Sequence, residues 1–148
     1  MKRFTFSLEK LLSLREFKEK EAEIALGKAN SRCEVIRTRL ETLAHDRITA
    51  SRSRRPGSDI AELRSIEMYI QLLDKKKEET LTELAEAELV LEKARAIYIE
   101  AHRDREVLSR LRDKKTAVWR KDLLDTEAAV LDDINNAREL RKSGDIST

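Results

Sequence analysis

Few side chains in this 148-residue sequence could support metal or nucleophilic chemistry, because it holds only two histidines and one cysteine. His45 and His102 stand in different halves of the chain. The paired-cysteine, His-x-x-x-His and glycine-rich phosphate-loop spacings of metal and nucleotide sites do not occur. Acidic residues are numerous, but they pair with basic ones at helical spacing, as Lys75 does with Glu79. The sequence therefore predicts a protein that is not an enzyme and uses no metal or cofactor.

Binding chemistry is concentrated near the C-terminal end, around the single tryptophan, Trp119. Residues 103–121 form a mainly basic band, and residues 122–133 form an acidic band without any basic residue. The basic band contains Arg103, Arg105, Arg110, Arg112, Lys114, Lys115, Arg120 and Lys121. The acidic band contains Asp122, Asp125, Glu127, Asp132 and Asp133. Tryptophan and arginine are enriched at the energetic centres of protein interfaces, so this stretch predicts a partner-binding surface.

Composition indicates long helices. Charged residues make up 41% of the chain and aromatic residues 4%, with 3 Gly and 1 Pro, and the abundant residue types are strong helix formers. The 31 basic and 29 acidic residues leave a net charge of +2, which argues against a nucleic-acid binder. Cys33 has no cysteine to pair with, and the chain holds no apolar run of membrane-spanning length. We therefore expect a soluble protein with neither a cleaved signal peptide nor a membrane span.

One turn divides the chain into two predicted helices. Pro56-Gly57 is a turn dipeptide, and Asp59 followed by Glu62 forms a capping box that opens a helix. The sequence predicts a single coiled-coil domain over residues 1–148. Its parts are a helix from about 5 to 50, a turn from about 51 to 58, a helix from about 59 to 141 and a short disordered tail.

Apolar residues recur at alternating spacings of three and four in both halves, which is typical of coiled-coil seams. The first seam is Leu12, Arg15, Glu19, Ala22, Leu26, Ala29, Cys33, Ile36, Leu40, Leu43 and Arg47. The second seam is Leu63, Ile66, Ile70, Leu73, Lys77, Thr80, Leu84, Ala87, Leu91, Ala94, Tyr98, Ala101, Arg105 and Leu108. Leu11, Leu14 and Phe17 indicate that the first stripe slips near its start.

These seams predict an antiparallel two-helix hairpin, all-α, in which the second helix is much longer and overhangs the first. Folding about the turn pairs residues whose numbers add up to about 110, so Cys33 should be a small buried residue opposite Lys77. Residues 109–141 should then have no intramolecular partner, and Trp119 should lie beyond the reach of the first helix. A rod with a single overhanging helix is the expected form.

Two motifs resemble the FliJ family of flagellar export proteins. The opening pattern Arg-Phe-x-Phe-x-Leu-x-x-Leu-Leu-x-Leu-Arg is present as Arg3, Phe4, Phe6, Leu8, Leu11, Leu12, Leu14 and Arg15. A basic stretch, an aromatic residue and an acidic stretch are present as Leu108, Leu111, Lys114, Lys115, Trp119, Glu127, Leu131, Asp132 and Asp133. The family's aromatic residue is often tyrosine, from which Trp119 is a modest departure.

The resemblance implies a non-enzymatic stalk or adaptor of the flagellar type III export apparatus, similar in shape to the central stalk of rotary ATP synthases. It implies three partners: the hexameric export ATPase, whose activity it promotes, the membrane export gate and the export chaperones. The expected location is the cytoplasm, peripheral at the inner membrane. We expect the ATPase to contact Phe4, Leu8, Arg110, Arg112, Lys115, Trp119, Arg120, Leu123 and Leu124. The exposed pair Met68 and Leu72 is a candidate contact for the export gate.

Three other readings fit parts of the sequence. A stalk protein of a virulence type III secretion system would share the fold. A structural coiled coil could self-associate weakly through the C-terminal overhang, burying its apolar residues in a second copy. A basic helix that binds nucleic acid would use the basic band and the arginines of the turn, although the nearly balanced charge opposes it.

Overall fold

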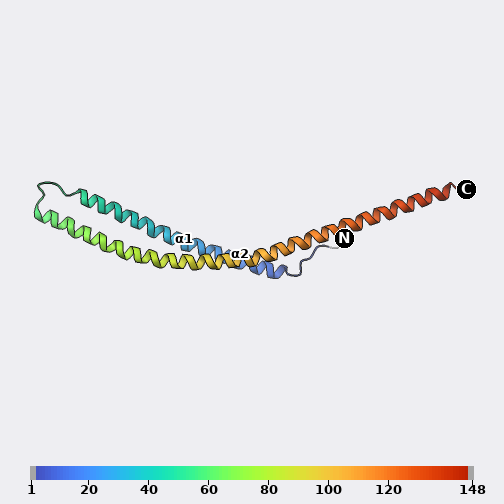
Figure 1. The fold of residues 1–148 in the computed structure, drawn as a ribbon, viewed down its shortest axis with the longest axis horizontal. Coiled ribbons are helices and arrows are strands. Elements are labelled where there is room, and N and C mark those ends of the chain that lie inside the picture. The colour runs from blue at the N-terminus through green and yellow to red at the C-terminus, as the bar shows by residue number, and fades with distance from the viewer. Residues whose placement is uncertain (1–2, 147–148) are drawn as a thin grey trace. The chain divides into compact units, whose positions relative to one another are not determined.

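The computed structural model describes residues 3–146, which form two helices joined by one connection (Figure 1). Helix α1 runs from Glu9 to Arg52 and helix α2 from Ile60 to Asp145, with 44 and 86 residues. The chain is thus an all-α helical hairpin with a longer second helix, as the sequence predicts. Helix α1 begins later than the expected position near residue 5, and α2 continues past residue 141. The last part of the expected tail lies outside the described residues.

Within residues 3–146, the one residue with a left-handed backbone lies in the connection. The amide of Ser58 donates to the carbonyl of Arg55 at 3.2 Å, and Gly57 has a φ of +90°. Proline at the second position of a turn and glycine with positive φ at the third define a type II β-turn. The carbonyl of Asp59 then accepts from the amide of Leu63 at 3.0 Å, so α2 begins directly after the turn.

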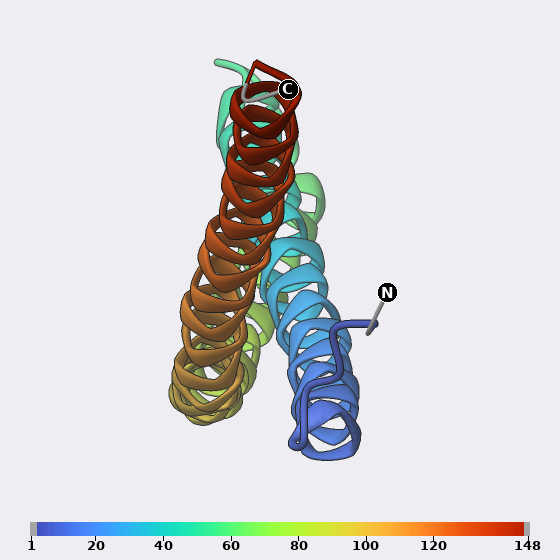
Figure 2. The same ribbon diagram turned by 90° about the vertical axis from the view of Figure 1, so that its right-hand side faces the viewer.

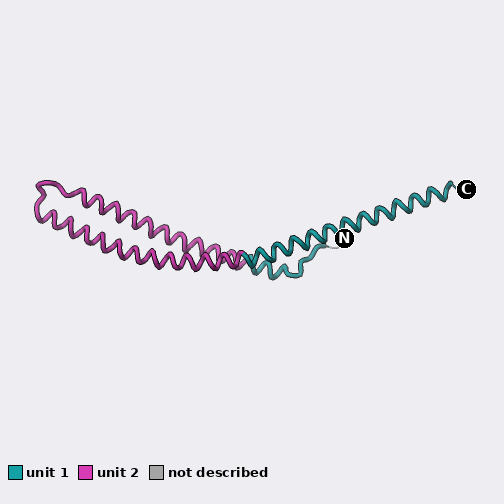
Figure 3. Tube along the Cα trace, viewed as in Figure 1, with its two compact units in different colours: residues 1–16, 103–148 teal, residues 17–102 magenta. Residues whose placement is uncertain are grey.

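The described residues pack as two compact units (Figure 3). Unit 2 comprises residues 17–102 and contains most of α1, the turn and the first part of α2. Unit 1 combines the N-terminal residues up to Glu16 with α2 from Arg103 onward.

The predicted seams form the core of unit 2. On α1 the fully or nearly fully buried residues include Ala22, Ala29, Cys33 and Ile36, and on α2 they are Ile70, Leu73, Thr80, Ala87 and Leu91. Cys33 is 0% exposed, which confirms that it is a small buried residue. Thr80 is accommodated because its hydroxyl donates to the carbonyl of Lys76 at 2.7 Å. Lys77 is exposed, so this seam position is not part of the core.

The predicted register is wrong by almost three helical turns. Cys33 packs in one cluster with Ala87 and Leu91 instead of facing Lys77, so partners in the core have numbers that add up to about 120. The prediction assumed that the helices end level with each other at the turn. Arg54 instead forms an ion pair with Glu67 of α2. The part of the connection before the β-turn therefore lies beside the first two turns of α2, because non-helical chain advances farther per residue than helix does.

The predicted slip at the start of the first seam is also wrong. Leu12 is 1% exposed and Ala22 is 6% exposed, so the spacing of three and four continues without a break. Leu14 and Phe17 are 48% and 61% exposed. They lie on the outer surface of α1, and they do not shift the seam. Across the described part of the chain, neither helix is long and apolar enough to cross a membrane.

Candidate partner-binding surface

A short non-helical stretch precedes α1 and packs on α2 within unit 1; its last residues form a turn in which the amide of Glu9 donates to the carbonyl of Phe6 at 3.1 Å. We call residues 4–8 the strap. Figures 1 and 2 show it as an irregular dark-blue trace before the first turn of α1. Phe4 and Leu8 are half-buried, Phe6 is 7% exposed, and the intervening Thr5 and Ser7 are exposed. Up to Phe6 this alternation resembles that of extended backbone, whose successive side chains point to opposite sides, and the turn at residues 7–8 then leads into α1.

The two phenylalanines of the strap hold specific side chains of α2. The Phe4 and Trp119 rings lie 5.8 Å apart between centroids and are tilted by 52°, within the range of favourable aromatic pairs. The ammonium group of Lys115 lies 5.8 Å from the centre of the Phe6 ring, at cation–π distance. Trp119 is therefore half-buried by the chain's own N-terminal residues.

Two ion pairs continue this contact along the first turns of α1. Glu9 approaches Arg112 at 3.4 Å, and Arg15 donates to the carboxylate of Asp104 at 2.6 Å. All four side chains remain between about one-third and one-half exposed, so each pair stabilises the contact only modestly. Their main effect is to fix which residues of α1 meet which residues of α2.

These contacts correct the expectation that residues 109–141 lack an intramolecular partner. Trp119 lies past the end of α1, as expected, but the strap reaches it. In the observed register the N-terminal end of α1 lies nearer to Trp119 than expected. The non-helical strap also spans a greater distance per residue than a helix would. The covered part of α2 ends near Leu123, which is half-buried, whereas residues 124–146 are all exposed.

The structure brings three of the predicted ATPase-contact residues to the contact between the strap and α2. Phe4 packs on Trp119, and Lys115 lies over Phe6. Leu8 on the strap and Leu123 on α2 are half-buried. A shallow hollow beside this contact is lined by Lys114, Lys115, Val118, Trp119 and Asp122. The basic and acidic bands meet here, so a partner in the hollow would contact basic side chains, an acidic side chain and the ring of Trp119 together.

The remaining predicted contact residues have different surroundings. Arg112 is engaged by Glu9, and Arg110 donates to Glu106 at 2.7 Å on its own helix. Arg120 and Leu124 are exposed, and Leu124 is 63% exposed. These two residues are therefore open to a partner without any rearrangement of the strap.

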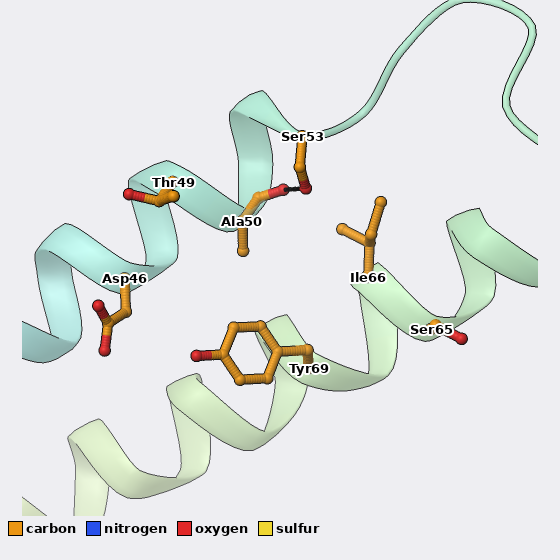
Figure 4. A pocket seen from close by; sticks show the side chains of 7 residues that line it. All are labelled: Asp46, Thr49, Ala50, Ser53, Ser65, Ile66 and Tyr69. Atoms are coloured by element: carbon orange, nitrogen blue, oxygen red, sulfur yellow. Dashed lines mark hydrogen bonds between the residues drawn. The ribbon is translucent and has the colours of Figure 1, made fainter.

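Met68 and Leu72, the candidate gate contacts, lie in unit 2 near the turn. They are 65% and 47% exposed and one helical turn apart. The same part of unit 2 has an open hollow between the helices, lined by Asp46, Thr49, Ala50, Ser53, Ser65, Ile66 and Tyr69 (Figure 4). The Ser53 hydroxyl donates to the carbonyl of Ala50 at 2.6 Å and is thereby occupied. The hollow has no arrangement of nucleophile and base.

The residues described hold no group of three or more His, Cys, Asp or Glu that could bind a metal ion. His102 instead contacts Glu19 at 3.0 Å and stacks on Tyr98, with ring centroids 6.0 Å apart. Glu19 and Tyr98 are seam positions, and His102 lies beside them with a side chain that is 42% exposed. The arrangement is a partly exposed polar contact between the two helices.

Sequence reasoning missed the part that Phe6 plays, although its ring is the most buried of the strap. It also missed the pairing of Glu9 and Arg15 with α2. The signal was present: Phe4, Phe6 and Leu8 alternate with small polar residues, which is a strand-like period of two. The spacing of three and four begins only at Leu12. The period of two in the strap therefore gives way to the helical period at the start of α1.

Comparison with known proteins gives one match. A family model described as Flagellar FliJ protein matches residues 4–144, which is nearly the whole chain. No curated protein and no solved structure matches.

Proposed function

The chain belongs to the FliJ family of flagellar proteins, and from this membership we propose that it is a non-enzymatic stalk or adaptor that binds the hexameric export ATPase. Flagellar export is the process that the family implies. In this proposal the chain promotes the ATPase, also contacts the export gate and the export chaperones, and works in the cytoplasm at the inner membrane. The family's flagellar description favours this role over a virulence secretion system.

One observation supports the ATPase-binding surface most. Phe4 holds Trp119 at the junction of the basic and acidic bands, and α2 continues beyond Leu123 with exposed residues only. A ring that turns or changes shape around a stalk needs charged and aromatic contacts that can be exchanged, since a tightly packed fixed interface would resist movement. The strap makes Trp119 a preorganised anchor, because its ring has lost part of its freedom before binding.

The structure indicates which residues test this proposal cleanly. Reversal of Arg112 or Lys115 would also disturb Glu9 or Phe6, so loss of binding could come from a loosened strap. Arg120 and Leu124 are exposed, so a variant with Arg120→Glu and Leu124→Ser should keep the strap intact. We expect this variant to lose at least about tenfold in affinity for the purified ATPase and to stimulate it less. Lys142→Glu, farther along the same exposed helix, is the matched control.

Pull-down, binding by titration and ATPase rates should be measured together with the circular dichroism spectrum. Unchanged binding and stimulation by the Arg120→Glu, Leu124→Ser variant, with an unchanged helical spectrum, would show that the ATPase binds elsewhere. Equal losses in the Lys142→Glu control would indicate a nonspecific charge effect and would contradict the assignment to these residues.

The gate contact is a separate proposal carried by the exposure of Met68 and Leu72. Large apolar side chains that stay about half exposed or more, such as Met68 at 65% and Leu72 at 47%, are available to a partner groove. We expect Met68→Asp with Leu72→Asp to abolish binding to the cytoplasmic part of the gate protein and to leave ATPase binding unchanged. Leu89→Asp is the control, because Leu89 is as exposed as Met68 and lies on the same helix.

A further inference from the structure

The exposed end of α2 carries two apolar stripes, and only one of them has a charge pattern that suits a second copy of this chain. The first stripe contains Leu123, Val130 and Ile134, and continues the side of α2 that the strap covers. The second stripe, which we call the Leu124 stripe, consists of Ala117, Lys121, Leu124, Ala128 and Leu131 at spacings of four and three. All five residues of the Leu124 stripe are exposed.

The Leu124 stripe lies away from the strap. The half-buried residues beside the strap are Thr116, Trp119 and Leu123. At about 100° per residue, the Leu124 stripe is turned from that side by more than a quarter of a turn. The exposed fractions of Leu124 and Leu131, 63% and 60%, agree with a side of the helix that nothing in unit 1 covers. A partner on this stripe would leave the contact between Phe4 and Trp119 in place.

Antiparallel pairing of two Leu124 stripes makes the charges complementary. With Leu124 placed against Leu124 of the second copy, contacting residues have numbers that add up to about 248, which sets Ala117 against Leu131. On one flank Lys114 then faces Asp132 of the second copy, and Lys121 faces Asp125. On the other flank Arg120 faces Glu127. Because the arrangement is two-fold symmetric, each of these three ion pairs occurs twice, and the two Lys121 side chains offset the two Asp125 carboxylates that the axis brings near each other.

The alternatives place like charges together. Parallel pairing would align the basic band with itself and the acidic band with itself, which is unfavourable. Antiparallel pairing through Leu123, Val130 and Ile134 would centre on the acidic band, and would bring Glu127 and its neighbours against the same residues of the other copy. The Leu124 stripe is thus the one of the two that supports self-association.

We propose that two copies of the chain associate through an antiparallel contact of their Leu124 stripes, centred on Leu124. The stripe covers only about 20 Å of helix at 1.5 Å per residue. Its area falls below the roughly 1,200 Å² of stable complexes, so the dimer is weak and exchanges with monomer. Its six exposed ion pairs make it sensitive to salt. This inference does not rest on the proposed function, since it concerns this chain alone.

Sedimentation velocity of the full-length chain, over a range of concentrations at low and high salt, tests the proposal. We expect a monomer–dimer equilibrium that weakens at high salt. Lys121→Glu should weaken dimerisation by about tenfold, because two attractive contacts become repulsive. Adding Asp125→Lys to Lys121→Glu should restore it, because the exchanged charges again face each other. A monomer at every concentration, or a Lys121→Glu variant that dimerises like the unchanged chain, would overturn the proposal.

Cross-linking tests the register independently of affinity. In a Cys33→Ala background, Leu124→Cys places a thiol at the two-fold axis, where it meets its own counterpart. Ala129→Cys is the matched control, because residue 129 is also exposed but lies more than a quarter of a turn from the stripe. We expect mild oxidation to yield a covalent dimer for Leu124→Cys several times faster than for Ala129→Cys. Equal rates would contradict an interface centred on Leu124.

Discussion

Phe4 packs against Trp119 at a centroid distance of 5.8 Å, although one is near the start of the chain and the other lies deep in the second helix. The contact is possible because the residues before α1 are not helical, so that every second side chain of the strap is buried or half-buried. The strap alternates buried and exposed residues, and then α1 takes over with helical spacing from Glu9. A helix over the same residues would turn Phe4 and Phe6 to different sides, and only one of them could reach α2.

The first prediction concerns the strap. Phe4→Ala should remove the ring that covers Trp119, so the tryptophan emission should shift to longer wavelength and its quenching by iodide or acrylamide should increase. Loss of the aromatic pair should destabilise the strap contact by about 1 kcal/mol. Phe17→Ala is the control, since Phe17 is 61% exposed and the same substitution should leave Trp119 unaffected. Identical spectra for Phe4→Ala and the unchanged chain would contradict the contact.

The seams could be predicted from sequence because they depend on the spacing of apolar residues along each helix, which does not involve the other helix. Leu12, Ala22, Ile36, Ile70 and Leu91 are each buried at a position that the spacing of three and four selects. The register could not be predicted in the same way. Sliding one seam along the other by a few turns keeps apolar residues in contact, so periodicity alone leaves several registers almost equally good.

The register is fixed by features outside the apolar spacing. One is the path of the non-helical connection, which places Arg54 beside Glu67. Another is the set of ion pairs between the helices, such as Arg39 with Glu83 at 3.0 Å and Arg37 with Glu88 at 3.4 Å. The candidate site depends on this register, so the sequence identified Trp119 and its charged neighbours without identifying Phe4 as the residue that holds it.

A disulfide tests the register directly. Cys33 packs with Ala87, so Ala87→Cys should form an intramolecular disulfide with Cys33 on oxidation. Lys77→Cys is the matched control, because Lys77 would face Cys33 in the register expected from the turn alone. Free-thiol counting and non-reducing mass spectrometry give the readout. A disulfide in Lys77→Cys but not in Ala87→Cys would reverse the assignment.

A core substitution tests which residues hold unit 2 together. Ile36 is 1% exposed, so Ile36→Ala should lower the free energy of unfolding by about 2–4 kcal/mol through lost apolar burial and a residual cavity. Val35→Ala, at a neighbouring residue that is 59% exposed, should change it by less than about 0.5 kcal/mol. Urea unfolding followed at the helical circular dichroism band compares the two. Similar costs for both variants would mean that the Ile36 side chain is not in the core.

The turn offers a test of backbone strain. Gly57 has a φ of +90°, a conformation that residues with a β-carbon rarely adopt, although no atom lies within 4 Å of an added β-carbon. Gly57→Ala should therefore destabilise the hairpin by about 1 kcal/mol through strain alone. The thermal unfolding midpoint should fall, whereas Gly27→Ala should raise it slightly, because residue 27 lies inside α1 with open space around it. A Gly57→Ala variant as stable as the unchanged chain would exclude the type II turn.

The ion pair between Arg47 and Asp74 should make the stability of the fold depend on pH in the acidic range. The Arg47 guanidinium donates to Asp74 at 2.7 Å, and this hydrogen bond holds the pKa of that carboxyl below its usual value. A lowered pKa in the folded state means that the pair stabilises the fold above about pH 4, the usual aspartate pKa. This stabilisation is lost as pH falls through the lowered pKa.

Asp74→Asn should therefore lower the urea midpoint at pH 7, and the difference from the unchanged chain should shrink between about pH 5 and pH 2. In an Arg47→Gln background the partner is already missing, so Asp74→Asn should then have a smaller effect that no longer follows this pH course. Urea unfolding at a series of pH values measures all four combinations. If Asp74→Asn cost the same stability at pH 2 as at pH 7 in the unchanged background, the pair would not be the source of the pH dependence.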